Sequence, residues 1–444
     1  MLRQFFPQFV EWLKALTDPR RRPDQCTFPV EFLLLLALLM FCGQRDSRRR
    51  LGRALRGGRL AGNIWRLVGR AREVLACHPD TMNNLMEALD PAGLEELLAR
   101  VFRQMRAARM LDRFRFDRRL TVAIDGAKLF SFNTQHCEHC THQTQDGVTR
   151  WFHYVLVAKV VTPIGLVVPL AFEFIENPHG EYDKQDCELK ARARLFEKID
   201  RLFPKLPLNV AGDGLYAEEG TMAECDRRGW NFMITLPDDK LPTLTAQLPP
   251  AAQGWTGTRT CTVNVGGTDA AGRYQGPPGK LERTVRWKAT VRYHGEVRHV
   301  VELQDTDRDG NRGYYNRWVT NVRPEHRNAF DLALTGRLRW KVENEGTNTP
   351  KNGGYEMEHA YGRMHNAWKN YFLILQLAQL LNDLVRLTDI LPKATGDPQA
   401  NFTALFGSMR DFADELMHSL KYGTPDLDGP PQLARRIRIC LLRC

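Results

Sequence analysis

The segments LTVAIDG at residues 120–126 and LNVAGDG at residues 208–214 decide the fold class of this chain. Each is an apolar run with the length of a buried β-strand, and each ends in Asp followed by Gly. An Asp at the end of a strand presents its carboxylate beyond the sheet, and the Gly lets another chain or a phosphate approach closely. If the two strands are neighbours in one sheet, the carboxylates of Asp125 and Asp213 converge.

The segments around these two strands predict a mixed sheet with helices packed against it. Residues 151–162 and 165–175 are rich in β-branched and aromatic residues, and a Pro-Ile-Gly turn separates them. Residues 185–203 have apolar side chains at helical spacing, residues 218–229 predict a second helix, and residues 231–237 a further strand. This order allows an antiparallel start and a parallel continuation, which is typical of α/β proteins. It is similar to the order of elements in ribonuclease-H-like proteins.

A third carboxylate follows in the segment RWKVENEG at residues 339–346. On a helix, Arg339 and Glu343 share a face because they are four residues apart. Carboxylates that lie close together repel unless a cation lies between them, and Mg²⁺ prefers oxygen ligands of this kind. We therefore expect Asp125, Asp213 and Glu343 to hold Mg²⁺, for which Mn²⁺ can substitute, with two ions in the active complex.

These three acidic residues, in this order of strands and helices, resemble the catalytic triad of DDE-type insertion-sequence transposases. The resemblance covers roughly residues 115–385, and the subgroup concerned carries a β insertion between the second Asp and the Glu, which 129 residues separate here. The subgroup has a signature of Tyr, two residues, Arg, three residues, Glu, six residues and Lys. Arg339 and Glu343 match it in register, Gly336 stands at the Tyr position, and Lys351 falls one place beyond the Lys position.

The resemblance implies an enzyme that cuts DNA at transposon ends and joins the freed 3′-hydroxyl to target DNA. Under it, Asp125, Asp213 and Glu343 bind the metal, while Arg339 and Lys351 contact phosphates. The expected partners are terminal inverted repeats and target, both double-stranded DNA, bound by a homodimer. The alternatives are a ribonuclease-H-like nuclease without strand transfer, and a degenerate or domesticated transposase that only binds DNA.

Positive charge is concentrated in the first part of the chain. The formal net charge is +11, and residues 1–119 hold 23 Lys and Arg against 13 Asp and Glu, a surplus of 10. A basic segment of this kind favours a polyanionic partner, with nucleic acid first. Arg48, Arg49 and Arg50 begin a basic ridge that we expect to contact DNA phosphates, the alternative being a solvated helix face.

Composition and periodicity also predict how the chain is divided. The expected units are a basic, helical DNA-binding domain at 1–119, a catalytic core at 120–237 and 317–365, an all-β insertion at 238–316, C-terminal helices at 366–425 and a basic tail at 426–444. The strongest apolar run, at 32–42, is too short to span a bilayer and predicts a buried helix. Ten scattered Cys fit a reducing compartment. We therefore expect a cytoplasmic, nucleoid-associated bacterial protein with no membrane partner.

Two further clusters of polar residues stand out. Cys137 and Cys140, within a run that also contains three His, have the spacing of a zinc knuckle, and His153 and Cys187 are further candidate ligands. The alternative is a loop with free thiols. Residues 181–188 contain four carboxylates, Glu181, Asp183, Asp186 and Glu188, which we interpret as helix N-terminal charges.

Overall fold

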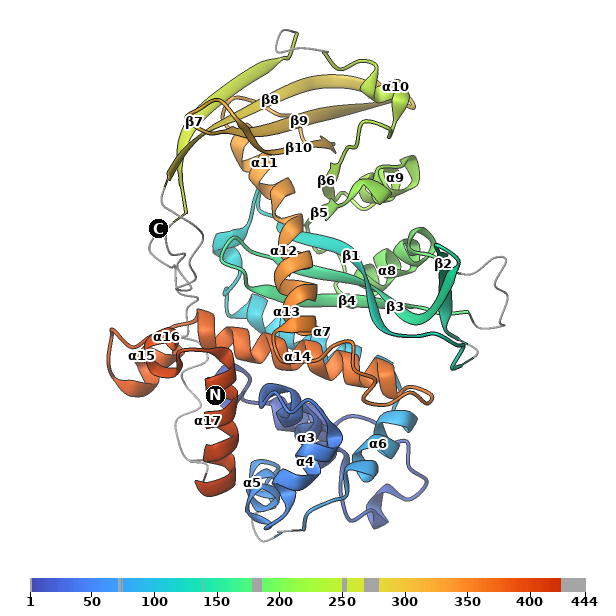
Figure 1. Cartoon of the computed structure of the whole chain (residues 1–444), viewed down its shortest axis with the longest axis vertical. Helices are drawn as coiled ribbons and strands as arrows, with labels where there is room; N and C mark the ends of the chain where they lie inside the picture. The colour runs from blue at the N-terminus through green and yellow to red at the C-terminus, as the bar shows by residue number, and fades with distance from the viewer. Residues whose placement is uncertain are drawn as a thin grey trace.

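One continuous mixed sheet of ten strands runs through the part of the chain that the structure describes (Figure 1). The structure is a computed structural model, and it describes residues 2–70, 73, 75–137, 139–177, 186–249, 254–266 and 279–424. The strands are β1 (Leu120–Phe132), β2 (Thr141–Gln145), β3 (Val148–Val161), β4 (Val167–Ile175), β5 (Leu208–Gly212), β6 (Asn231–Thr235), β7 (Gly257–Val265), β8 (Gly279–Tyr293), β9 (Glu296–Thr306) and β10 (Arg312–Thr320). Their order in the sheet is β2-β3-β1-β5-β6-β10-β9-β8-β7, and β4 also pairs with β3. The fold is therefore α/β with a mixed, largely antiparallel sheet.

Strand β1 joins the antiparallel and the parallel parts of this sheet. It pairs antiparallel with β3 on one side and parallel with β5 on the other, and β5 pairs parallel with β6. The sequence predicted that the strand ends at Asp125, and this was wrong, because β1 continues through Phe132. The added residues alternate between buried and exposed side chains, as in Ala127, Lys128 and Leu129, and they pair with the equally long β3.

The segment predicted as an all-β insertion extends the same sheet. Near its end, β10 pairs antiparallel with β6 through Trp318, Val319 and Thr320, and along its length it pairs with β9, which leads to β8 and β7. These strands form the yellow upper part of Figure 1, where one short helix, α10 (Pro242–Thr245), accompanies them. A small second core around Trp287 and Trp318 packs them onto helix α11 (Ala329–Arg337).

Helices α8 (Glu188–Leu202) and α9 (Glu219–Arg227) connect the parallel strands. The predicted apolar face of α8 is confirmed, since Leu195, Phe196 and Ile199 are fully buried and the helix packs against β3 and β4. A single 3-10 turn, η4 (Gly214–Tyr216), lies between β5 and α9.

The first part of the chain is helical, as predicted. Its helices are α1 (Leu2–Phe5), α2 (Phe9–Lys14), η1 (Pro23–Gln25), α3 (Val30–Cys42), α4 (Arg48–Leu55), α5 (Arg59–Leu67), α6 (Pro79–Ala88), α7 (Pro91–Ala107) and η2 (Asp112–Phe114). Helix α3 is the predicted apolar helix, and it is buried on nearly all sides because α2, α5, α6 and the C-terminal helix α14 (Ala367–Leu387) surround it. Asp90 caps α7 through a hydrogen bond from the backbone N–H of Ala92.

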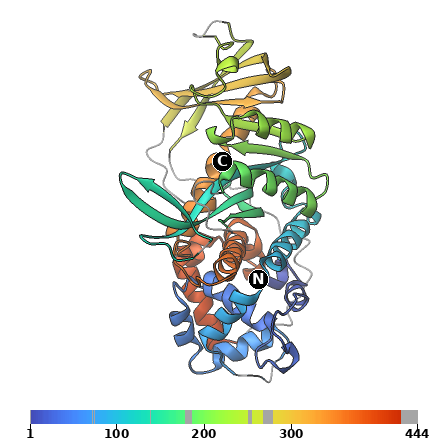
Figure 2. The same cartoon turned by 90° about the vertical axis from the view of Figure 1, so that its right-hand side faces the viewer.

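The C-terminal helices pack back onto the N-terminal ones (Figures 1 and 2). After α11 come α12 (Arg339–Glu343), the π-helical segment η5 (Asn344–Asn348), α13 (Thr349–Asn352), α14, α15 (Ile390–Thr395), α16 (Phe402–Phe406) and α17 (Met409–Tyr422). Helix α14 lies between α3 and the sheet, contacting α3, α6, α7 and β4, while α17 contacts α5. The predicted basic tail at 426–444 lies outside the described residues. No described helix has both the length and the apolar character needed to cross a membrane.

Candidate active site

Asp125 lies on β1, and Asp213 directly follows the parallel neighbour of that strand, β5. The two strands pair from Leu120 with Leu208 to Ala123 with Ala211, and beyond this pairing the charge of Asp213 lies close enough to raise the pKa of Asp125. Both side chains are half-buried. Asp213 follows the last residue of β5 and caps η4, because its Oδ1 accepts a hydrogen bond of 2.9 Å from the backbone N–H of Leu215. This cap fixes the orientation of the Asp213 carboxylate.

Glu188 brings another carboxylate to the same site, from the first residue of α8. Its Oε1 accepts a hydrogen bond from the hydroxyl of Tyr154, and its Oε2 accepts one of 2.7 Å from the hydroxyl of Tyr216. Burial, and then the charge of Glu188, raise the pKa of both phenols, so they remain hydroxyl donors. A Cβ on Gly126 would lie 2.6 Å from this carboxylate. The Gly that follows Asp125 therefore leaves the space that Glu188 occupies.

Glu343 comes to the site on α12, the helix that contacts β1 and β3 (Figure 1). Its Oε2 lies 3.2 Å from Nη2 of Arg339, one turn earlier. The Glu343 side chain is 52% exposed and so is open to a ligand. Glu345, by contrast, is buried, with its Oε1 2.8 Å from Nζ of Lys341. Of the two glutamates in the motif, Glu343 is therefore the one that is accessible to a ligand.

The pKa of Asp125 shows that these carboxylates share one electrostatic field. Burial raises this pKa most, the guanidinium of Arg339 lowers it, and the charges of Asp213, Glu188 and Glu343 raise it, and together these effects bring it to about 7. A carboxyl group that is half protonated at neutral pH is rare outside functional sites. The site therefore has more negative charge than Arg339 alone compensates.

The donor set fits a hard divalent cation. All the candidate ligands are carboxylate oxygens, which Mg²⁺ and Mn²⁺ prefer, and an added +2 charge would relieve the repulsion that acts on Asp125. Within the described chain, His136, Cys137 and Cys140 form the one group of three whose ligand atoms lie within 4.8 Å of one another. The carboxylate oxygens around Asp125 do not form such a group, so they are more widely spaced than the ligands of a single ion. Carboxylates that repel one another are expected to separate until a cation draws them together.

The π-helical segment η5 begins directly after Glu343, and buried side chains from two other elements fix it. Lys159 on β3 donates a hydrogen bond of 2.5 Å to the carbonyl of Gly346, and Gln379 on α14 donates one of 2.6 Å to the carbonyl of Glu345. Burial lowers the pKa of Lys159 to about 7. Segments of this kind are rare and occur mostly at functional sites. Here the segment sets the orientation of the helix on both sides of Glu343.

Lys351 lies on α13, beyond the π-helical segment, and the structure does not place it among the groups that act on Asp125. Its Nζ lies 2.8 Å from Oε1 of Glu358. A π-helix closes its hydrogen bonds one residue later than an α-helix, so η5 adds one residue to the path of the helix. Lys351 lies eight residues after Glu343. The extra residue turns it toward the helix face on which a lysine seven residues after Glu343 would lie if the α-helix were uninterrupted.

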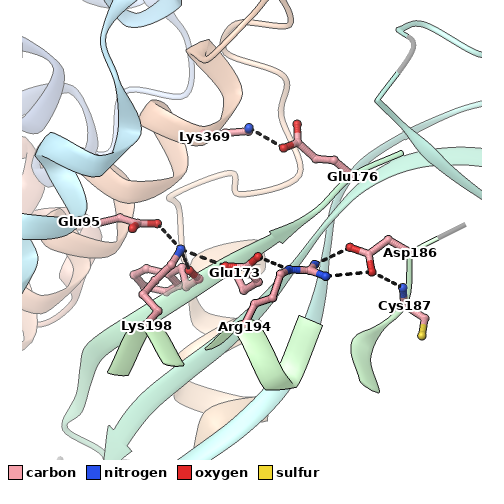
Figure 3. Close-up of polar contacts among 9 residues, drawn as sticks. Glu95, Glu173, Glu176, Asp186, Cys187, Arg194, Lys198 and Lys369 are labelled. Carbon is pink, nitrogen blue, oxygen red and sulfur yellow. Dashed lines mark hydrogen bonds and ion pairs between the residues drawn. The ribbon is translucent and has the colours of Figure 1, made fainter. Parts of the chain in front are cut away.

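A network of ion pairs holds the start of α8 in place (Figure 3). Arg194 on α8 lies 2.5 Å from Asp186, just before the helix, and 2.6 Å from Glu173 on β4. Lys198, one turn further along α8, lies 3.0 Å from Glu95 on α7 and 3.1 Å from Glu173. The Lys198 and Glu95 side chains are mostly buried, so solvent screens these pairs less than it would at the surface. The network joins α7, β4 and α8 and prevents α8 from sliding along the sheet.

The acidic cluster predicted as helix N-terminal charges therefore has several roles. Asp186 belongs to the ion-pair network, and Glu188 faces the candidate metal site. Glu181 and Asp183 lie outside the described residues. Sequence reasoning missed Glu188 as a site residue because an acidic residue in the first turn of a helix is favoured by the helix dipole in any case.

Gly336 explains why no tyrosine stands at the first position of the signature. A Cβ at this residue would lie 2.7 Å from the indole ring of Trp318, which is fully buried in the second core. Trp318 belongs to β10 and pairs across to Thr235 on β6, so it cannot move away without breaking the sheet. Trp318, on the strand β10 that joins the insertion to the core, therefore fills the space that a tyrosine at this position would need.

A basic groove of about 1160 Å³ adjoins α12. Thr121 on β1 and Trp340 on α12 both line it, so it borders the elements that carry Asp125 and Glu343. The indole of Trp340 is 53% exposed. Basic side chains outnumber acidic ones along the groove, and they are Arg113, Arg115, Arg323, Arg327, Arg337 and Lys341.

The predicted ridge Arg48, Arg49 and Arg50 begins α4, which lies in the lower, blue part of Figure 1, away from β1, β5 and α12. Arg48 lies 3.1 Å from Asp80 and Arg50 lies 3.0 Å from Asp46, while Arg49 is exposed. The structure thus keeps the ridge on the surface and separate from the carboxylates. Cys137 and Cys140 lie in the connection between β1 and β2, next to His153 on β3.

Comparison with known proteins assigns the chain to no family. No family model matches it, and no curated protein matches it. The function of the site is therefore inferred from its own residues and geometry.

Proposed function

We propose that this protein is a DDE-type transposase, which cuts DNA at transposon ends with divalent metal and joins the 3′ ends to target DNA. One observation carries the proposal. Asp125 on β1 and Asp213, directly after the adjacent parallel strand β5, interact electrostatically, and α12 brings Glu343 into the electrostatic field of Asp125. The strand order β4-β3-β1-β5-β6, with an antiparallel first half and a parallel second half, supports a ribonuclease-H-like core.

The roles of the chain's own residues follow from this arrangement. Asp125, Asp213 and Glu343 would hold Mg²⁺ or Mn²⁺, and the bound metal would activate the attacking oxygen and stabilise the leaving oxygen at phosphorus. Arg339, one helical turn from Glu343, would contact a phosphate oxygen of the cleaved strand. Glu188, which two tyrosine hydroxyls hold in position, would orient the ligands or complete the metal site.

DNA binding is the part of the proposal that charge supports. The basic groove beside α12 has a surplus of guanidinium groups that would bind the phosphates of a DNA strand next to the proposed active site. Trp340 is exposed at this groove and could stack on an unpaired base. The ridge at Arg48 to Arg50 would bind the terminal inverted repeat further away, and two chains would act together on paired ends.

The test is cleavage of labelled DNA that carries the ends flanking this gene, incubated with purified protein and Mg²⁺ or Mn²⁺. Wild type is compared with Glu343→Gln and with Glu415→Gln, the same change at an exposed site on α17. We expect wild type and Glu415→Gln to cut at the element boundary and Glu343→Gln to bind the DNA without cutting it.

The products separate the alternatives. A 3′-joined or hairpin product supports a transposase, whereas nicks without joining indicate a nuclease of the same core. Binding by wild type with no cleavage in either metal would overturn the proposal in favour of a degenerate transposase that only binds DNA. The same outcome would direct attention to Gly336, where the signature has Tyr, and to Lys351, which lies one place beyond the Lys position of the signature.

A further inference from the structure

A compact group of sulfur and imidazole ligands lies in the connection between β1 and β2. The ligand atoms of His136, Cys137 and Cys140 all lie within 4.8 Å of one another. His153, from the middle of β3, places Nε2 3.5 Å from Sγ of Cys137. Neighbouring ligands of one tetrahedral zinc ion are about 3.3–3.8 Å apart, given Zn–S and Zn–N bonds of about 2.3 and 2.0 Å. The spacing in the protein is thus close to that of a four-coordinate site.

The imidazole of His136 lacks protein partners. Neither of its ring nitrogens has a hydrogen-bond partner among the described residues, whereas Nε2 of the fully buried His153 faces Sγ of Cys137. Buried polar atoms are nearly always satisfied, so the two unpartnered nitrogens of His136 beside these thiols point to a ligand.

The two thiols lie in one short turn of the chain. Sγ of Cys140 donates a hydrogen bond of 3.1 Å to the carbonyl oxygen of Cys137. Cys140 is fully buried, and neither thiol forms a disulfide. Both sulfur atoms are therefore available as ligands.

Aromatic rings surround the group and hold the two imidazoles in place. His153 stacks on Trp368 of α14 with ring centroids 4.0 Å apart and an angle of 20° between the planes. Phe130 and Phe132 on β1 contact His136, with centroid distances of 5.8 and 4.6 Å. These contacts fix the orientation of both rings before a metal binds, while His136 and Cys137 remain partly exposed.

We propose that His136, Cys137, Cys140 and His153 bind one structural Zn²⁺ in a closed tetrahedral site. Two thiolates and two imidazoles favour zinc, whereas the oxygen ligands around Asp125 favour magnesium. Binding converts both thiols to thiolates and releases their protons to solvent. The two metal sites would thus be chemically distinct and would not compete for the same ion.

The geometry also gives the zinc a role in the catalytic site. The carbonyl of His139, between the two Cys, accepts a hydrogen bond of 3.1 Å from the backbone N–H of Asn177. The side-chain Oδ1 of Asn177 in turn accepts one of 3.1 Å from the backbone N–H of Asp186. Asp186 lies two residues before Glu188. A zinc ion that fixes the connection would therefore brace the start of α8, and with it the carboxylate of Glu188.

The first experiment measures zinc in protein purified without chelator, by elemental analysis. We expect about one zinc per chain in wild type, and less than a tenth of that in Cys137→Ser and His153→Gln. Cys187→Ser is the matched control, because Cys187 is exposed and lies near the site without belonging to the cluster. It should retain the full zinc content. Zinc-free wild type, or ligand variants that keep the metal, would overturn the proposal.

A second measurement does not depend on the folding of any variant. Wild type stripped of metal is titrated with Co²⁺ and then treated with an alkylating reagent, with and without added Zn²⁺. A tetrahedral site with two thiolates should give visible absorption and thiolate charge-transfer bands, and Zn²⁺ should protect Cys137 and Cys140 but not Cys187 from alkylation. Equal alkylation of all three, or a disulfide between Cys137 and Cys140 in reducing buffer, would contradict zinc binding. None of these readouts requires DNA cleavage, so zinc binding and the transposase proposal can fail independently.

Discussion

Nζ of Lys159 lies 2.5 Å from the carbonyl oxygen of Gly346, and this hydrogen bond joins β3 to the π-helical segment that follows Glu343. The same ammonium group donates to the side chain of Gln376 on α14. A fully buried lysine is unusual, and this one lies within the electrostatic influence of Asp125. The path of the chain directly after α12 therefore depends on a buried amine that can lose its charge near neutral pH.

Replacing Lys159 with Met should remove a pH dependence of stability. Burial lowers the pKa of Lys159 from 10.5 to about 7, so between these values the unfolded chain holds a proton that the folded chain has released. The free energy of unfolding of wild type should therefore rise with pH between about 7 and 10.5, by on the order of a few kcal/mol, and this rise should shrink in Lys159→Met. Denaturant unfolding measures it, with the exposed Lys190→Met as control. Equal slopes in wild type and Lys159→Met would contradict the assigned burial.

Asp125→Asn should abolish cleavage and yet stabilise the metal-free protein. The folded-state pKa of Asp125 is raised from 3.8 to about 7, so folding favours the protonated form, and ionisation costs stability as pH rises through this window. This loss of stability is complete above pH 7. We therefore expect the free energy of unfolding of Asp125→Asn to exceed that of wild type by on the order of a few kcal/mol at pH 8 and to equal it at pH 4. Thermal unfolding in chelator at the two pH values checks this. A variant less stable than wild type at pH 8 would show that the carboxylates do not repel one another.

Glu188→Gln should lower the rate of cleavage without weakening DNA binding. The amide retains the shape of the side chain but loses one acceptor for the two tyrosine hydroxyls and the negative charge near Asp125. We expect a loss of about 10-fold to 100-fold in single-turnover cleavage, the usual scale for residues that support a metal site. Glu197→Gln, on the exposed face of the same helix, should cleave like wild type. Full activity in Glu188→Gln would remove Glu188 from the site.

Changing Arg48, Arg49 and Arg50 together to Ala should weaken binding to terminal-repeat DNA and reduce its salt dependence. Each phosphate contact that is lost should lower the slope of log affinity against log salt by about 0.9. The measurement is a binding titration at several salt concentrations, with Arg227→Ala, an exposed arginine on α9, as control. An unchanged slope would mean that the ridge is a solvated helix face.

Part of this site could be predicted from the sequence because two similar segments, at 120–126 and 208–214, each contain an Asp after an apolar run. These segments pair in parallel from Leu120 with Leu208 to Ala123 with Ala211, which brings Asp125 and Asp213 to the same part of the sheet. The helical spacing of Arg339 and Glu343 was also enough to predict their 3.2 Å pair. Local periodicity defines these relationships, so they need no knowledge of the tertiary structure.

Other features depend on contacts between distant segments, which local patterns do not contain. Glu188 enters the site only because tyrosines on β3 and η4 hold it there. The π-helical segment needs Lys159 and Gln379 from two other elements. The extension of β1 beyond Asp125 depends on the length of β3, its pairing partner. In each case the deciding partner lies at least 19 residues away in the chain.

The pairing of β10 with both β6 and β9 has a consequence for modularity. Because the strands that lead to Asp125 and Asp213 and the strands of the insertion belong to one hydrogen-bonded sheet, the insertion is not a separate module that can be removed or exchanged. Deleting it would uncover β6 as an unprotected edge and expose the ring of Trp318, a combination that promotes aggregation. Lineages that vary this region would therefore have to lengthen, shorten or decorate its outer strands β7 and β8, while the strand that touches the core stays in place.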